Sequence, residues 1–211
     1  YRGCTSNFTV MDKEGNVLSQ TQTIRKWWGC GVVIPGRGFV MNNTMADFSA
    51  KVGVRTTQGL AYGMANAVRP GKTPLSSMSP SLVMKDGKPF LSVGAAGGPR
   101  IITSALQLII NAIDYGMMMD SAVKSPHMCC LTLDQGLELE EGFSPDTIRI
   151  LKERGHKIKE TSDFGVLLVL PNGIENLDGA FFPGGTSRVD GGGGVLTESG
   201  AICIDGFCFC K

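Results

Sequence analysis

Polar side chains crowd two short segments at the start of the chain. Residues 5–11 (TSNFTVM) and residues 17–23 (VLSQTQT) are both rich in Thr, Ser, Asn and Gln. Between them, residues 12–16 (DKEGN) carry Gly and Asn where tight turns favour them, so the pattern predicts a β-hairpin. A hairpin with so many hydroxyl and amide groups builds a poor core, and it suits a reactive site better.

The register of this hairpin brings two threonines together. If Met11 pairs with Val17, antiparallel pairing places Thr5 opposite Thr23. The pattern therefore predicts a hydroxyl nucleophile on the first strand with a second hydroxyl as its partner.

Strand signals continue after the hairpin. Short strands are predicted at residues 32–34 and 38–43, and the Gly-, Asn- and Pro-containing residues 50–73 predict a long ordered loop. A second hairpin pairs residues 81–84 with residues 90–93 across a Lys-Asp-Gly-Lys turn.

Helical patterns occupy the middle of the chain. Residues 101–115 are apolar nearly all round, which predicts a buried helix closed by Gly116. A short helix is predicted at residues 121–124. Another is predicted up to Arg154, with Ser144 as its N-cap and a proline at its first position.

The last pattern is again strand-like. Strands are predicted at residues 165–170 and 174–181, around a turn at residues 171–173 (PNG). Strands, then helices, then strands favour an α+β fold with helices packed on sheets over a doubly wound parallel sheet.

Length and charge exclude several classes of protein. The 211 residues are enough for one domain with a real core. With 20 basic and 19 acidic residues the net charge is +1, which gives no electrostatic case for nucleic acid or an anionic membrane. The sequence has no apolar run long enough for a membrane span, and no signal-peptide pattern opens it.

The seven cysteines do not indicate a metal site. Their number is odd, and neither a CxxC spacing nor a Cys/His cluster is present, so a structural zinc is not expected. Reduced, partly buried thiols are the simpler prediction. A disulfide within the group Cys203, Cys208 and Cys210 stays open.

Three short segments are candidates for chemistry, and each has a plainer explanation. The glycine-rich residues 94–99 (GAAGGP) join a strand to a helix, where backbone N–H groups bind an oxyanion, but a tight turn needs the same glycines. Residues 74–80 (PLSSMSP) present three hydroxyls that suit a carboxylate, or form an ordinary turn. Asp47, in residues 42–48 (NNTMADF), suits an ammonium group, or caps a helix.

A histidine-based triad is disfavoured. The chain has only His127 and His156, and neither lies near a GxSxG elbow. A nucleophile at Thr5 therefore needs another base. The α-amino group of Thr5 would serve if Thr5 were itself an N-terminus, because the pKa of an α-amine lies near neutrality.

The order and spacing of these segments resembles the small, catalytic subunit of the γ-glutamyltranspeptidases. The resemblance extends over residues 5–194 and is strongest at residues 5–16 (TSNFTVMDKEGN), 42–49 (NNTMADFS), 74–80 (PLSSMSP) and 94–102 (GAAGGPRII). It implies an α+β fold, a four-layer αββα sandwich of the N-terminal-nucleophile hydrolase type, completed by a large subunit.

The resemblance also divides the chain. Residues 1–4 would be the tail of the large subunit or a propeptide. Residues 5–196 would be the catalytic small subunit, and residues 197–211 a C-terminal extension of unknown role. Its partner would be the large subunit from the same precursor, in a heterodimer or a higher assembly. Relatives are often periplasmic or extracellular, and a cytoplasmic location stays open.

The mechanism follows from the same resemblance. The precursor would cleave itself between Cys4 and Thr5. The freed α-amine of Thr5 would act as base while its Oγ attacks a γ-glutamyl amide such as glutathione. Water or an amino acid would then accept the acyl group, without a cofactor or metal. The other implied site residues are Thr23 beside the nucleophile, Gly97 and Gly98 in the oxyanion hole, Asp47 on the substrate α-ammonium, and Ser76 and Ser77 on its α-carboxylate.

The chain departs from the family pattern where the α-amino group would bind. Arg25 stands where the family usually has Asn, and Thr44 where it has Gln or Glu; Gln58 takes the place of a gating aromatic. A positive Arg25 would oppose a cation, so a dicarboxylic acyl group without an amine is the alternative substrate. A homologue that never matures and has no activity stays open too, as does Cys4 in the role of nucleophile. The register with Thr23 favours Thr5.

Overall fold

A computed structural model describes residues 3–56, 60–160, 169–188, 194–196, 202–204 and 207–209 of the chain. The chain begins with the predicted polar hairpin, formed by β1 (Gly3–Met11) and β2 (Val17–Lys26). Met11 pairs with Val17 and Thr5 with Thr23, which confirms the predicted register. One irregularity interrupts it, because Cys4 pairs with Arg25 and the ladder shifts by one residue between Cys4 and Thr5.

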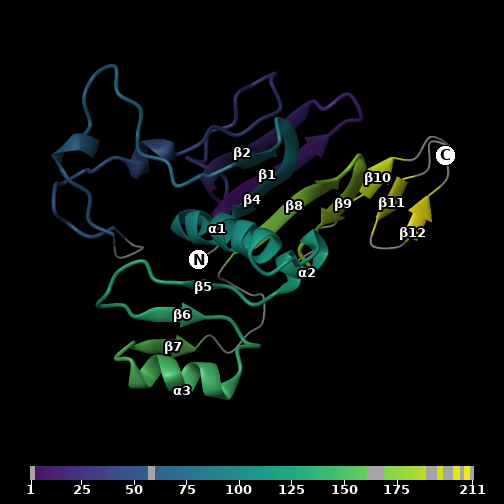
Figure 1. Cartoon of the computed structure of the whole chain (residues 1–211). Helices are drawn as coiled ribbons and strands as arrows, with labels where there is room; N and C mark the ends of the chain where they lie inside the picture. Colours follow the sequence, from purple (N-terminus) through teal and green to yellow (C-terminus); the bar gives the residue numbers. More distant parts are fainter. Residues whose placement is uncertain are drawn as a thin grey trace.

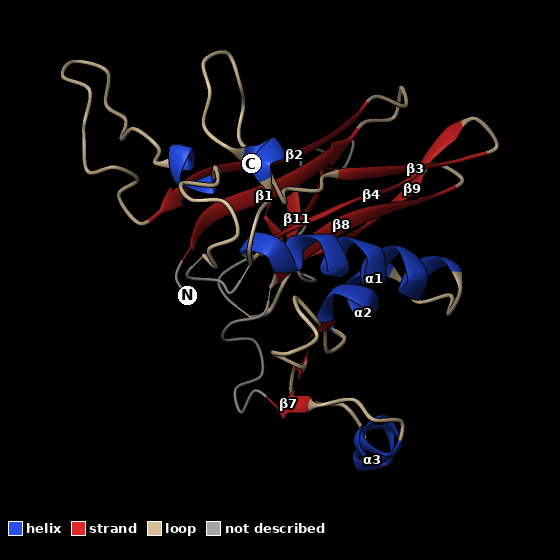
Figure 2. Cartoon of the chain, turned by 90° about the vertical axis from the view of Figure 1, so that its left-hand side faces the viewer, coloured by secondary structure: helices blue, strands red, loops and turns tan. Residues whose placement is uncertain are grey.

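The second sheet has four antiparallel strands in the order β3-β4-β8-β9. Their bounds are β3 Ser81–Lys85, β4 Lys88–Ala96, β8 Leu170–Leu177 and β9 Ala180–Gly184. Two helices lie against one face of this sheet, α1 (Ile101–Ile113) and α2 (Met119–Lys124) (Figure 1). The hairpin of β1 and β2 lies on the opposite side of the sheet (Figure 2).

Strand β4 is the centre of the molecule because both of its faces are covered. Leu91 and Val93 pack with the helical side chains of Leu108, Met119 and Val123 in one apolar cluster. On the other face, the Ser19 hydroxyl of the hairpin donates a hydrogen bond to the carbonyl oxygen of Val93 (3.2 Å). The described residues thus form a helical layer, a sheet and a second sheet layer, which are three layers of the expected αββα sandwich.

A smaller unit lies beside the sandwich (Figure 1). It contains the three-stranded sheet of β5 (Met128–Cys129), β6 (Leu137–Leu139) and β7 (Ile158–Glu160), with α3 (Pro145–Glu153) against it. The prediction for α3 is confirmed, since Ser144 caps it by accepting a hydrogen bond from the N–H of Thr147. The three strands of the small sheet were not predicted, because each has only two or three residues.

Residues 27–80 form no strand longer than an isolated bridge where the structure describes them. They contain two 3₁₀ turns, η1 (Thr44–Asp47) and η2 (Met64–Asn66). The strands predicted at residues 32–34 and 38–43 reduce to one bridge between Val33 and Val40. The long loop over residues 50–73 agrees with the structure over the part that is described.

Two other expectations were wrong. The turn predicted at residues 171–173 lies inside β8, and the chain reverses at Asp178 and Gly179 instead. Gly173 belongs there because a Cβ would lie 2.7 Å from the sulfur of Met119, so it permits close packing and makes no turn. Helix α1 is not buried all round, since Ile102 and Leu106 are more than half exposed.

The C-terminal part described consists of β10 (Gly194–Leu196), β11 (Ile202–Ile204) and β12 (Phe207–Phe209), paired in that order. Cys203 and Cys208 are register partners across β11 and β12. Within the described residues, no helix combines the length and apolar character needed to cross a bilayer.

Candidate functional site

The two paired threonines lie at the N-terminal end of the hairpin and are hydrogen-bonded to each other. The Thr5 hydroxyl donates to Thr23 Oγ1 at 3.0 Å, and the Thr23 hydroxyl donates to the carbonyl oxygen of Cys4 at 2.9 Å. The backbone N–H of Arg25 also donates to Thr23 Oγ1, at 2.8 Å. A hydroxyl has one donor and two acceptor positions, so Thr23 is fully used. It is held against both the Thr5 hydroxyl and the peptide bond before it.

Arg25 occupies an unusual backbone conformation next to this pair. Its φ is +72°, in the left-handed region that non-glycine residues seldom adopt. The side chain then reaches η1, where Nε donates to Asp47 Oδ1 at 2.6 Å and Nη2 donates to the carbonyl oxygen of Ala46 at 3.0 Å. Arg25, which was predicted to oppose a substrate cation, thus forms a direct ion pair with Asp47, the residue predicted to bind that cation.

The side chain of Asn66 connects the segment that contains Asp47 (residues 42–48) to residues 74–80, which we call the serine segment. Its amide Nδ2 donates to the carbonyl oxygen of Asp47 at 2.7 Å, and its Oδ1 accepts the N–H of Leu75 at 2.9 Å. Leu75 directly precedes Ser76, so one side chain sets the distance between two predicted substrate-binding segments. Sequence reasoning missed Asn66, because a single asparagine in a long loop carries no signal of its own.

The hydroxyls of residues 74–80 make local turns. Ser76 Oγ accepts the N–H of Met78, and the Ser79 hydroxyl donates to the carbonyl oxygen of Ser77. Met78 packs against the apolar cluster that contains Ala95 and Ile101. These two residues lie before and after the turn at residues 97–98, which we call the glycine turn. The structure thus brings the serine segment to the glycine turn.

Contacts between the hairpin and β4 show toward which end of β1 the glycine turn lies. Ser19, paired with Thr9, contacts Val93, whereas the Asn7 side chain covers Gly94 so closely that a Cβ there would clash at 2.3 Å. From Val93 to Gly94 on β4, the contact with the hairpin therefore shifts along β1 in the direction of Thr5. Gly97 and Gly98 are the next glycines along the chain.

Both glycines of that turn need conformations that other residues avoid. The φ of Gly97 is +153° and that of Gly98 is +63°. They lead into the 3₁₀ turn η3 (Gly98–Arg100) and then α1, where the first N–H groups have no intrahelical partner. This geometry can supply donors to an anionic oxygen.

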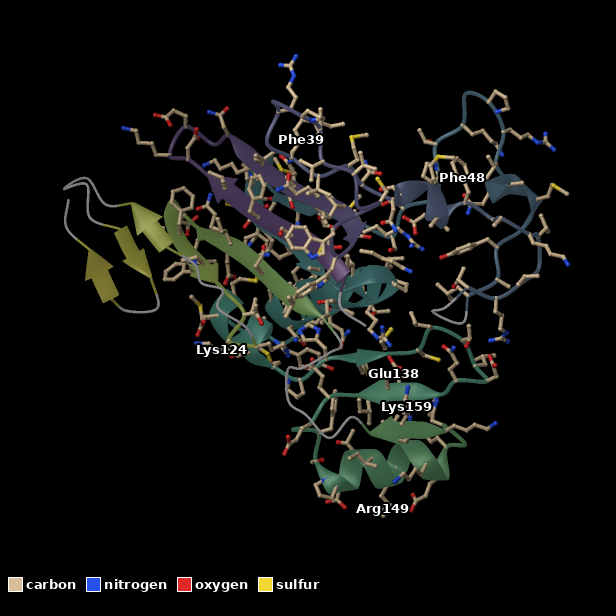
Figure 3. All side chains as sticks on the ribbon, turned by 180° about the vertical axis from the view of Figure 1, so that it is seen from behind. Phe39, Phe48, Lys124, Glu138, Arg149 and Lys159 are labelled. Carbon is tan, nitrogen blue, oxygen red and sulfur yellow. The ribbon has the colours of Figure 1, made fainter. Side chains whose placement is uncertain are left out.

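An ion-pair cluster fixes the end of this turn to the small sheet. Arg100 donates from Nε and Nη2 to the two carboxylate oxygens of Glu138, at 2.8 and 3.0 Å, and Lys159 Nζ lies 3.1 Å from Glu138 Oε1. Glu138 and Lys159 point toward each other from neighbouring strands (Figure 3). Burial acts to raise the pKa of Glu138, but the hydrogen bonds from Arg100 and Lys159 outweigh it, so that pKa lies below its usual range.

The remaining predicted site residues are Thr44 and Gln58. Thr44 begins η1, and its N–H is bonded to Asn42 Oδ1 at 3.0 Å. Gln58 lies outside the described residues. No group of three metal-ligating side chains gathers in the described ranges.

His127 is unsuited to act as a base. It is 2% exposed, and neither ring nitrogen has a hydrogen-bond partner among the described residues. Burial, with the charge of Arg188 as a second cause, lowers the pKa of His127 to about 3. His156 is exposed on the surface.

The buried His127 should make stability depend on pH. Its pKa is lower folded than unfolded, so the unfolded chain takes up a proton that the native protein does not. Stability should therefore fall below about pH 6.5, by up to about 1.4 kcal/mol per pH unit. His127→Leu should remove this dependence, and urea unfolding at about pH 7 and about pH 5 would measure it. The exposed His156→Leu is the control; equal pH dependence in both variants would contradict the assignment.

Comparison with known proteins agrees with the fold. The gamma-glutamyltranspeptidase family model matches residues 2–181. The glutathione hydrolase proenzyme of Escherichia coli is 47% identical over 154 residues, which are 73% of this chain and 27% of that protein. The acylase ACY 1 proenzyme of a Pseudomonas species is 38% identical over 154 residues, 73% of this chain and 25% of that protein. The chain thus spans about a quarter of the length of these relatives.

A solved structure matches over nearly its whole chain. The T380A mutant of Helicobacter pylori gamma-glutamyltranspeptidase superposes with a TM-score of 0.80 at 39% identity, covering 87% of this chain and 99% of that one. The fold is therefore that of the N-terminal-nucleophile hydrolase sandwich. More specifically, the chain belongs to the γ-glutamyltranspeptidase family.

Proposed function

We propose that this chain is the catalytic part of an amide hydrolase and acyltransferase whose nucleophile is Thr5. The acyl donor would be an amide of a γ-carboxyl group, and γ-glutamyl compounds such as glutathione are the first donors to test. The observation that carries the proposal is the hydrogen-bonded set of Thr5, Thr23 and the Cys4 carbonyl. These hydrogen bonds support the view that Thr5 carries a reactive hydroxyl next to the peptide bond that precedes it.

Cleavage of the Cys4–Thr5 bond would come first. Thr5 Oγ would attack the carbonyl carbon of Cys4, forming an ester while the C–N bond breaks and the nitrogen becomes a free amine. Water would then hydrolyse the ester, leaving a carboxylate on Cys4. The Thr23 hydroxyl, already donating to the Cys4 carbonyl oxygen, would stabilise the charge that develops there.

The mature site would repeat this chemistry on a substrate. The Thr5 α-amine takes the hydroxyl proton as Oγ bonds to the acyl carbon, and it passes that proton to the leaving amine as the amide bond breaks. Gly97 and Gly98 would hold the oxyanion. Ser76 and Ser77 would bind the distal carboxylate. Water, or the amine of an amino acid, would then release the acyl group from Thr5.

A second polypeptide from the same precursor would complete the site. The outer face of the hairpin leaves Phe8, Val10 and Leu18 between 39 and 52% exposed. Ile102 and Leu106 form an exposed apolar stripe on α1. Large apolar side chains on two faces support a large subunit that covers them and supplies the fourth layer.

Intact mass and amide turnover test the proposed function together. The full-length precursor that contains this chain should yield a fragment beginning at Thr5, and the processed protein should release nitroaniline from a γ-linked p-nitroanilide. Cleavage before Thr5 with acyl transfer is the expected result. An uncleaved precursor that turns over no amide would contradict the proposal and favour a non-maturing homologue.

A further inference from the structure

The acyl-binding region of this chain contains an ion pair where a free carboxylate would be needed to bind an ammonium group. Arg25 Nε and Asp47 Oδ1 are 2.6 Å apart, and their side chains are only 12% and 32% exposed. Partial burial makes such a pair stronger and less screened by salt than a surface pair. Arg25 Nη2 also holds the carbonyl oxygen of Ala46, so two hydrogen bonds fix the guanidinium on η1.

Hydrogen bonds connect the pair both to the nucleophile and to the serine segment. Arg25 is joined to Thr5 through Thr23, because its backbone N–H and the Thr5 hydroxyl both donate to Thr23 Oγ1. Asp47 is joined to Leu75, and so to Ser76, through the side chain of Asn66. An acyl group held by both Thr5 and the serine hydroxyls would therefore lie close to Arg25 and Asp47.

This arrangement works against a substrate with an α-ammonium. The charge of the Asp47 carboxylate is already paired with that of Arg25. A substrate ammonium group would therefore have to displace the guanidinium or lie next to its positive charge. A methylene group at that position has neither penalty. Arginine has five N–H donors, of which two are used in these contacts, so the guanidinium also favours a nearby carboxylate.

We propose that the Arg25–Asp47 pair makes this site selective for acyl groups of simple dicarboxylic acids, such as glutaryl, over γ-glutamyl. The proposal rests on the proposed function, because it assigns the acyl class of the same Thr5 site. Arg25 is then the residue that determines specificity, and Asp47 holds Arg25 instead of the substrate.

The decisive variant is Arg25→Asn in the full-length, processed protein. Asparagine tolerates the left-handed conformation at φ +72° better than most residues, so the hairpin should keep its shape. The readout is kcat/KM for glutaryl-p-nitroanilide divided by kcat/KM for γ-glutamyl-p-nitroanilide. The unmodified protein should prefer the glutaryl substrate. Arg25→Asn should lower the ratio by about 10- to 100-fold, the range expected for one hydrogen bond to a charged group.

A matched control and a binding measurement separate this proposal from the proposed function. Arg37→Asn, at an exposed loop position, should leave the ratio unchanged. Calorimetric titration should show glutarate binding more tightly than L-glutamate, and Arg25→Asn should reduce that difference. Absence of turnover with this binding preference intact would refute the proposed function alone. A preference for γ-glutamyl or L-glutamate, equal preference, no binding of either acid, or a ratio unaffected by Arg25→Asn would overturn the selectivity proposal.

Discussion

Replacing Thr5 with alanine should leave the precursor uncleaved and abolish amide turnover. The substitution removes the hydroxyl that the structure holds against Thr23 Oγ1, and with it the atom that would attack both the Cys4 carbonyl and the substrate. Loss of a nucleophile lowers kcat on the order of 10⁴-fold or more. Intact mass should show one uncut polypeptide, and the release of nitroaniline should fall to background.

Two further variants make this test specific. Ser6→Ala changes the neighbouring hydroxyl on the exposed face of β1, so both processing and turnover should be unchanged. Thr5→Ser keeps a hydroxyl and should retain processing at a reduced rate. If Thr5→Ala were cleaved as completely as Ser6→Ala, the nucleophile would have to be another residue, and Cys4 would be the next to replace.

The hairpin could be predicted from sequence because its information is local. A five-residue turn and a single strand pairing fix the register from Met11 to Thr5, so the meeting of Thr5 and Thr23 followed from counting. The position of Arg25 could not be counted in this way. The ladder shifts just before it, and its left-handed φ aims the side chain at Asp47, which is 22 residues away. Irregularities of this kind have no periodic signature.

The serine and glycine segments illustrate a different limit. Their residue types suggested anion binding, but a turn was the plainer explanation for each segment alone. The contacts that position these segments come from other residues. Asn66 links Asp47 to Leu75, and Met78 packs at the glycine turn. The turn wrongly predicted at residues 171–173 has a similar origin, because Gly173 allows Met119 of α2 to approach β8 closely. Contacts between distant segments decided these positions, and local propensity did not.

Removing Arg188 should produce the largest loss of stability among the substitutions considered. Its guanidinium is fully buried and pairs with Glu140, which is 1% exposed. It also donates to the carbonyl oxygens of Val123 at 2.7 Å and Ser125 at 2.9 Å, near the end of α2. Arg188→Met would leave the Glu140 carboxylate buried without this partner, and should lower the free energy of unfolding by about 3–5 kcal/mol.

Two further variants test whether burial of the Arg188–Glu140 pair causes the loss of stability. One replaces a surface arginine, and the other replaces both members of the buried pair. Arg149 pairs with Asp146 and Glu153 on α3, but all three side chains are more than half exposed. Arg149→Met should therefore change the free energy of unfolding by less than about 1 kcal/mol. Combining Arg188→Met with Glu140→Gln removes the uncompensated charge and should recover part of the loss, while the two carbonyl groups still lack the hydrogen bonds from Arg188. Equal urea midpoints for Arg188→Met and Arg149→Met would show that the buried pair does not hold α2 and the small sheet together.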